Sequence, residues 1–169
     1  MVKSVYSKMV KEKKMANVLL SPLYSDVYGE PFSSGDFSKR MKMQKLIYLL
    51  QEAGIIIGDY NFYWYKHGPY SQQLQNDILS TNTSKLYHIN YSENANRIVS
   101  SIRNIINESN EYPTDVWAEC LASLQYLRTN IFSINSSDDE IFRELKKRKP
   151  HLNNEDANKT ALRELKALF

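Results

Sequence analysis

The sequence is poor in the residues that usually mark a catalytic or metal-binding site. Its one cysteine, Cys120, excludes an internal disulfide and a cysteine-based metal cluster, and favours a reducing compartment. Its three histidines are scattered and lack H-x-x-x-H or H-E-x-x-H spacing. Its five glycines form neither a G-x-G-x-x-G nor a Walker pattern. We therefore expect no catalytic residue, no bound metal and no cofactor.

Long apolar runs are missing as well. The longest, residues 46–50 and 55–57, are far shorter than the ~20 residues that a bilayer-spanning helix needs. The first residues are rich in lysine, and no continuous apolar segment follows them, so we expect no secretory signal. These absences predict a cytoplasmic chain with no membrane partner.

The composition itself is that of an ordinary globular domain. Of the 169 residues, 42% are hydrophobic and 24% are charged, which fits a single domain over 1–169. The net charge is only +3, but basic residues gather in two places. The first group is Lys39, Arg40, Lys42 and Lys45, and the second is Lys146, Lys147, Arg148 and Lys149. Such groups could meet phosphate or an acidic protein surface, although a solvated helix face is the simpler interpretation.

Apolar spacing predicts that most of the chain is helical. The pattern predicts a basic N-terminal helix over about 2–24, a loop over 26–36 and helices near 37–53, 71–79, 95–106, 114–131, 137–147 and 154–168. Gly54 is placed to end the second helix. Ser71 is expected to cap the third helix, Asn90 with Glu93 the fourth, Ser137 with Glu140 the sixth, and Asn153 or Asn154 the last.

Two short segments favour strands instead. The four consecutive aromatic residues at 62–65 are typical of a strand, and His67–Ser71 then interrupts it. Residues 86–89 read as a second strand that would pair with the first. We therefore predict a mainly α compact domain of about six to seven helices with one small β-hairpin. Its parts would be the helix over 1–25, the helix and ribbon over 37–90, and the helical remainder over 91–169.

The aromatic strand supplies the candidate binding residues. Side chains alternate along a strand, so Phe62 and Trp64 would face one side, and Tyr63 and Tyr65 the other. Aromatic residues exposed together often mark a partner surface, although helices could also cover both sides. The candidates for partner contact are Tyr63, Tyr65, His67 and Tyr70. Gly68, Pro69 and Ser71 are interpreted as structural, since no G-x-S-x-G motif accompanies Ser71 and His67.

These same residues carry a resemblance to a known family. Residues 43–50 (MQKLIYLL) and 62–71 (FYWYKHGPYS) resemble the signature of YwgA-like and SocA-like (Panacea) antitoxin-type proteins, some of them phage-associated. Residues 119–127 and Lys149-Pro150 resemble the later helices of the YwgA-like members, and His67 stands where an aromatic residue is common. The resemblance implies a mainly helical bacterial or phage-encoded domain that binds a toxin or another protein directly.

A different class of function stays open at this point. Helix, helix and ribbon is also the order of a winged helix, so residues 37–90 could form a DNA-binding regulator with Lys39, Arg40, Lys42 and Lys45 facing phosphates. Against this, the would-be recognition helix over 71–79 is short and contains no Lys or Arg. A phage counter-defence protein that binds a host factor is a third interpretation. The sequence also leaves a homodimer open.

Overall fold

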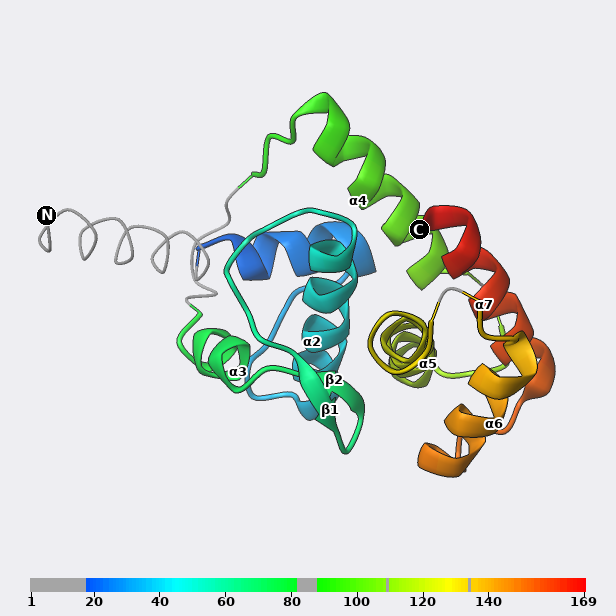
Figure 1. Ribbon diagram of the computed structural model, residues 1–169. Coiled ribbons are helices and arrows are strands. Elements are labelled where there is room, and N and C mark those ends of the chain that lie inside the picture. Colours follow the sequence, from blue (N-terminus) through cyan, green and yellow to red (C-terminus); the bar gives the residue numbers. More distant parts are fainter. Residues whose placement is uncertain (1–17, 82–87, 109, 134) are drawn as a thin grey trace, which may run out of the picture.

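The computed structural model describes residues 18–81, 88–108, 110–133 and 135–169, and within them the chain is mainly α-helical (Figure 1). Residues 18–28 are helical, so the first predicted helix continues past residue 24; its earlier part lies outside the described residues. The elements that follow are α2 (Phe37–Glu52), β1 (Tyr63–Tyr65), β2 (Gly68–Tyr70), α3 (Gln72–Leu79), α4 (Glu93–Ile106), α5 (Thr114–Tyr126), η1 (Leu127–Ile131), α6 (Asp138–Arg148) and α7 (Glu155–Leu168).

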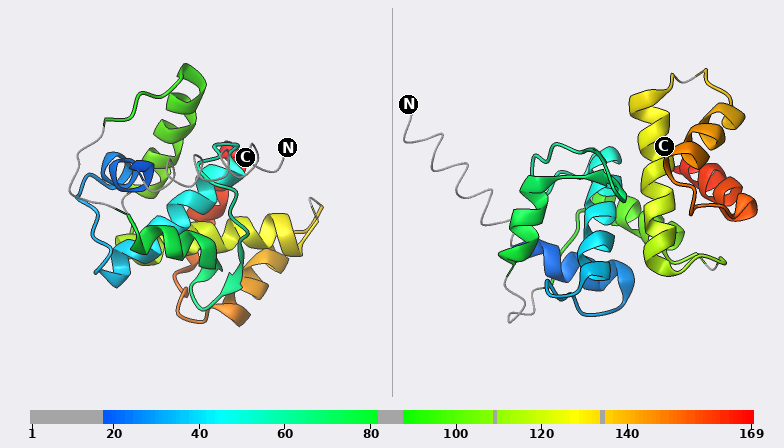
Figure 2. Two further views of the ribbon diagram at one scale, coloured as in Figure 1. Left: turned by 90° about the vertical axis from the view of Figure 1, so that its left-hand side faces the viewer. Right: turned by 90° about the horizontal axis from the view of Figure 1, so that it is seen from below.

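Helices α2 and α5 form the centre of the fold. They pack against each other, and α5 also packs against α7 on its other side (Figure 2). Residues 42–50 of α2 and 117–125 of α5 are all buried, so neither helix has a solvent-facing side over these stretches. The core is therefore built around two helices that are enclosed by the rest of the fold, rather than around one amphipathic layer.

Most of the predicted helix ends are confirmed, because the capping side chains make the expected bonds. The Ser71 hydroxyl accepts from Leu74 N at 3.3 Å, and the Asn154 side chain accepts from Ala157 N at 2.9 Å. Ser137 and Glu140 form the predicted capping box. The prediction that Asn90 caps α4 was wrong. Ser92 is the N-cap: its backbone is extended, and its hydroxyl accepts a hydrogen bond from Ala95 N at 3.3 Å.

The predicted hairpin exists, but its second strand is not the predicted one. Strand β1 pairs antiparallel with β2, with Tyr63 opposite Tyr70 and Tyr65 opposite Gly68. Residues 88–89 form no strand, and 86–87 lie outside the described residues. The Gly68-Pro69 pair, interpreted as a strand break, lies inside β2: Gly68 has φ +80°, and a two-stranded ribbon tolerates proline because both strands are edges. The hairpin therefore lies between α2 and α3, whereas the winged-helix order considered for 37–90 places the ribbon after two helices.

Candidate functional site

The outer side of the hairpin presents three tyrosines. Tyr63 and Tyr65 are exposed at 46% and 47%, and Tyr70 is half-buried beside them. The ring centroids are 6.3 Å apart for Tyr63 and Tyr65, 5.8 Å for Tyr63 and Tyr70, and 5.2 Å for Tyr65 and Tyr70. We call Tyr63, Tyr65 and Tyr70 the tyrosine face.

The opposite side of the hairpin is turned towards the core. Phe62 and Trp64 are half-buried and packed against the hydrophobic core, which is the alternation expected of the strand. The Trp64 ring lies 5.7 Å from the Tyr126 ring and is covered by the Arg148 guanidinium at 5.1 Å. The tyrosine face is therefore the solvent side of a ribbon whose other side is fixed by packing.

Buried polar side chains from α2 hold the second strand. The Gln44 amide donates to Ser71 O and accepts from Ser71 N, both at 3.0 Å. Lys45 Nζ donates to Pro69 O at 2.7 Å, although the lysine is only 1% exposed. Since unpaired polar groups are costly to bury, these bonds fix the position of β2 on α2.

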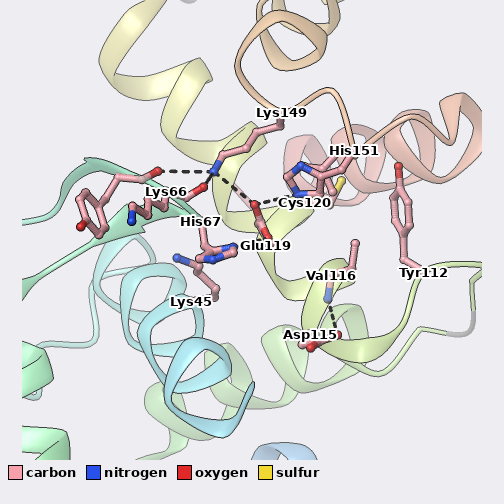
Figure 3. A network of polar contacts seen from close by, with 12 residues as sticks. Lys45, Lys66, His67, Tyr112, Asp115, Val116, Glu119, Cys120, Lys149 and His151 are labelled. Carbon is pink, nitrogen blue, oxygen red and sulfur yellow. Dashed lines mark hydrogen bonds and ion pairs between the residues drawn. The ribbon is translucent and has the colours of Figure 1, made fainter. Parts of the chain in front are cut away.

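A buried carboxylate on α5 joins two further parts of the chain (Figure 3). Glu119 is 2% exposed, and its Oε2 lies 3.2 Å from His67 Nδ1 in the hairpin loop. Its Oε1 lies 3.2 Å from Lys149 Nζ and 3.1 Å from His151 Nε2, in the connection between α6 and α7. Lys149 Nζ also donates to Lys66 O and Tyr65 O of the hairpin. The Glu119 cluster, which we define as Glu119, Lys149, His67 and His151, thus ties the hairpin loop to α5 and to the end of α6.

The sequence reasoning did not single out Glu119. Its neighbours Trp117, Cys120 and Leu121 belong to the apolar stripe of the helix. A carboxylate next to that stripe was the feature of the sequence that could have indicated a buried charge. Burial lowers the pKa of Lys45 to about 7, opposed by the Glu119 charge and assisted by that of Lys149. Burial lowers the pKa of Lys149 as well, and Glu119 opposes this. Glu119 is thus paired with Lys149, whereas Lys45 has no carboxylate within ion-pair distance among the described residues, and burial disfavours its charged form.

A pocket of about 430 Å³ opens beside Lys45, between the first half of α2, the hairpin and α3. Its walls include three cationic residues, Arg40, Lys45 and Lys66, and three aromatic ones, Phe37, Tyr65 and Tyr70. None of the described residues that line it carries a carboxylate. The pocket is adjacent to the tyrosine face and shares two of its members.

The first predicted basic group is not a surface that can meet a nucleic acid. Lys42 is buried, and its amine pairs with Glu30 and lies 4.8 Å from the centre of the Tyr28 ring. Lys45 is buried under β2. Lys39 donates to Pro31 O at 2.6 Å, and Arg40 donates to Ser34 O at 2.7 Å. Lys39, Arg40 and Lys42 tie α2 to the preceding loop, and Lys45 ties it to β2, so the spacing of the four residues reflects structural contacts.

The residues of the second basic group also differ in their contacts and exposure. Lys149 belongs to the Glu119 cluster, and Arg148 bonds Glu144 at 2.5 Å while covering Trp64. Lys146 and Lys147 alone of the four are exposed. The four residues do not form one continuous basic surface.

Comparison of the chain with protein-family models, with curated proteins and with solved structures found no match. The resemblance of the GPYS segment to antitoxin-type proteins therefore stays a prediction. No helix among the described residues is long and apolar enough to cross a membrane.

Proposed function

We propose that this protein is a non-enzymatic binding module that contacts another protein through the tyrosine face. The observation that carries the proposal is the exposure of Tyr63 and Tyr65 side by side on a hairpin whose backbone is held by buried bonds. Tyrosine supplies a large contact area with few rotatable bonds, and it is enriched among the residues that dominate interface energies. The partner would be a toxin, as the resemblance implies, or another host or phage protein.

The fixed position of the hairpin supports this function. Binding costs free energy when loops must be ordered, and a pre-organised surface avoids that cost. Lys45 of α2 and Lys149 at the end of α6 each bond backbone carbonyls of the hairpin. The Glu119 cluster is then a structural support of the binding surface rather than a catalytic group.

The DNA-binding alternative has weaker support. Lys42, Lys45 and Lys149 are buried, and α3 contains no Lys or Arg that could enter a groove. Specific binding of duplex DNA depends on exposed cations near phosphates and on side chains that reach base edges. We expect at most weak binding to DNA that is indifferent to sequence and falls steeply as salt rises.

Affinity capture from the native host tests the proposal. The unaltered chain, Tyr63→Ala, Tyr65→Ala and the control Lys147→Ala are used as baits, and captured proteins are identified by mass spectrometry. Lys147 is a suitable control because its side chain is 78% exposed and lies on α6. We expect one protein to be retained by the unaltered and Lys147→Ala chains and reduced about tenfold by either tyrosine variant. Equal capture by all four chains, or nanomolar sequence-specific binding of DNA at physiological salt, would contradict the proposal.

A further inference from the structure

The pocket between α2, the hairpin and α3 has the features of a ligand site. Its volume of about 430 Å³ lies within the ~300–1,000 Å³ range of small-molecule pockets. Arg40 and Lys45 come from α2 and Lys66 from the hairpin loop, yet all three residues line the same space. His67 stands at the same wall, with its Nδ1 directed to Glu119.

The charge of this site is not balanced by the protein. Glu119 contacts His67 of the pocket wall, but this buried carboxylate is also paired with Lys149 and lies within 3.1 Å of His151. Lys45 makes a single hydrogen bond to the described residues, with Pro69 O, which is a neutral acceptor. A buried amine without its own counter-ion favours a ligand that brings negative charge. A phosphate carries about −1.5 to −2 charge, so it suits Arg40 and Lys66, with the buried Lys45 behind them, better than a single carboxylate does.

The remaining walls indicate what the phosphate would be attached to. Phe37 is 59% exposed, and the rings of Tyr65 and Tyr70 lie beside the cationic wall, so a flat ring can stack there. Gln75 of α3 also lines the pocket, and its side-chain amide makes no hydrogen bond to any described residue. An amide offers both a donor and an acceptor to the edge of a nucleobase.

We propose that this pocket binds a nucleoside monophosphate, with the phosphate at Arg40 and Lys66 beside the buried Lys45, and the base against the aromatic residues that line the pocket. The proposal does not depend on the protein-binding function. Tyr63 belongs to the tyrosine face but does not line the pocket, whereas Lys66 lines the pocket and is outside the tyrosine face. Protein binding and nucleotide binding can therefore be tested with different variants.

Titration of the isotope-labelled protein with adenosine 5′-monophosphate, followed by amide NMR shifts, tests the site. We expect the shifts to gather at residues 37–45 and 65–75. Adenosine, inorganic phosphate and phenyl phosphate, each of which lacks one part of the ligand, should bind at least about tenfold more weakly. Lys66→Gln should weaken binding of the nucleotide about tenfold, since it removes a charged donor to phosphate. Lys147→Gln, with the same change of charge on exposed α6, and Tyr63→Ala should leave it unchanged.

The outcomes separate this proposal from the protein-binding function. Absence of shifts at millimolar nucleotide, or equal affinity of Lys66→Gln and the unaltered chain, overturns the site even if the tyrosine face binds a protein. Equal affinity for phenyl phosphate or inorganic phosphate overturns the nucleotide assignment. Because Arg40 also bonds the loop at Ser34 O, Arg40→Gln is used only with a thermal denaturation measurement that shows it is folded.

Discussion

Gly68 of the hairpin lies directly against Ser123 of α5. Gly68 has φ +80°, and a Cβ added to it would lie 2.4 Å from Ser123 Oγ. Two requirements for glycine, a left-handed backbone and a close approach to another segment, are therefore met at one position. The Ser123 hydroxyl is fully buried and has no hydrogen-bond partner among the described residues.

Gly68→Ala should lower the free energy of unfolding by about 2–5 kcal/mol. A left-handed conformation costs a residue with a Cβ about 1–2 kcal/mol, and the contact with Ser123 adds overpacking of about 1–3 kcal/mol. Urea denaturation of the variant measures the change. Gly35→Ala is the control, because a Cβ there meets only Ser33 Oγ at 3.8 Å. An unchanged urea midpoint for Gly68→Ala would remove this account of the turn.

Ser123→Ala should be neutral or stabilising by up to about 1 kcal/mol, because it removes a buried hydroxyl that has no partner. In combination with Gly68→Ala, the same change removes the atom nearest to the added Cβ. The double variant should therefore be more stable than the sum of the two single changes predicts, by about 1 kcal/mol or more. Strict additivity in the double-mutant cycle would show that the two residues do not meet.

Glu119→Gln should destabilise the fold by about 3–5 kcal/mol, because it leaves the buried Lys149 without its counter-charge. Glu144→Gln is the matched control on α6, where the carboxylate pairs with Arg148 four residues later. Pairs of that kind contribute about 0.3–0.5 kcal/mol. Chemical denaturation of the two variants should thus differ by several kcal/mol, and similar losses would contradict a structural role for the Glu119 cluster.

Lys45 makes stability depend on pH above neutrality. Its pKa in the folded protein is lowered to about 7, whereas lysine in an unfolded chain keeps its proton to about pH 10. Between these values the unfolded state binds more protons, so the free energy of unfolding rises with pH, by up to about 1.4 kcal/mol per pH unit. Below pH 7 the amine is protonated in both states, and this contribution to the slope disappears.

Thermal denaturation between pH 6 and pH 9 measures this effect. We expect a higher melting temperature at pH 9 than at pH 7, with a weaker dependence in Lys45→Met. Lys149 acts in the same direction, since burial lowers its pKa too, so some slope should persist in that variant. Lys147→Met is the control. A falling melting temperature over this range in the unaltered chain, or the same slope in Lys45→Met, would contradict the assignment.

The helices were predictable because their ends and apolar stripes are local features. Ser71, Ser137 and Asn154 each bond a backbone amide three residues ahead, which spacing alone indicates. Sequence reasoning failed where tertiary packing decides. Both α2 and α5 are buried on all sides over much of their length, so periodicity could not tell that Lys45 and Glu119 point inwards. The partner of β1 was missed for a related reason: Gly68-Pro69 resembles a break until Ser123 and Lys45 are seen to hold it.

A substitution in the tyrosine face should weaken binding of the partner, whereas a substitution at the cap of α3 should lower stability. Tyr65→Ala should weaken binding of the captured partner by at least about 1–2 kcal/mol, because exposed aromatic residues act as interface anchors. Its melting temperature should change little, since the side chain is 47% exposed. Ser71→Ala should instead lose about 1 kcal/mol of stability with the bond from Leu74 N, and still bind the partner at permissive temperature. Partner titrations and thermal melts of the two variants give the comparison.

The opposite result would contradict both the assignment of the tyrosine face as the binding surface and the proposal that the protein is not an enzyme. A folded Ser71→Ala or His67→Ala protein that has lost all activity, beside Tyr65→Ala and Tyr70→Ala proteins that bind normally, would place a reaction at the turn. His67→Ala needs the denaturation measurement as well, because its Nδ1 contacts Glu119 at 3.2 Å. With that control, loss of stability and loss of function are distinguishable at each of the four positions.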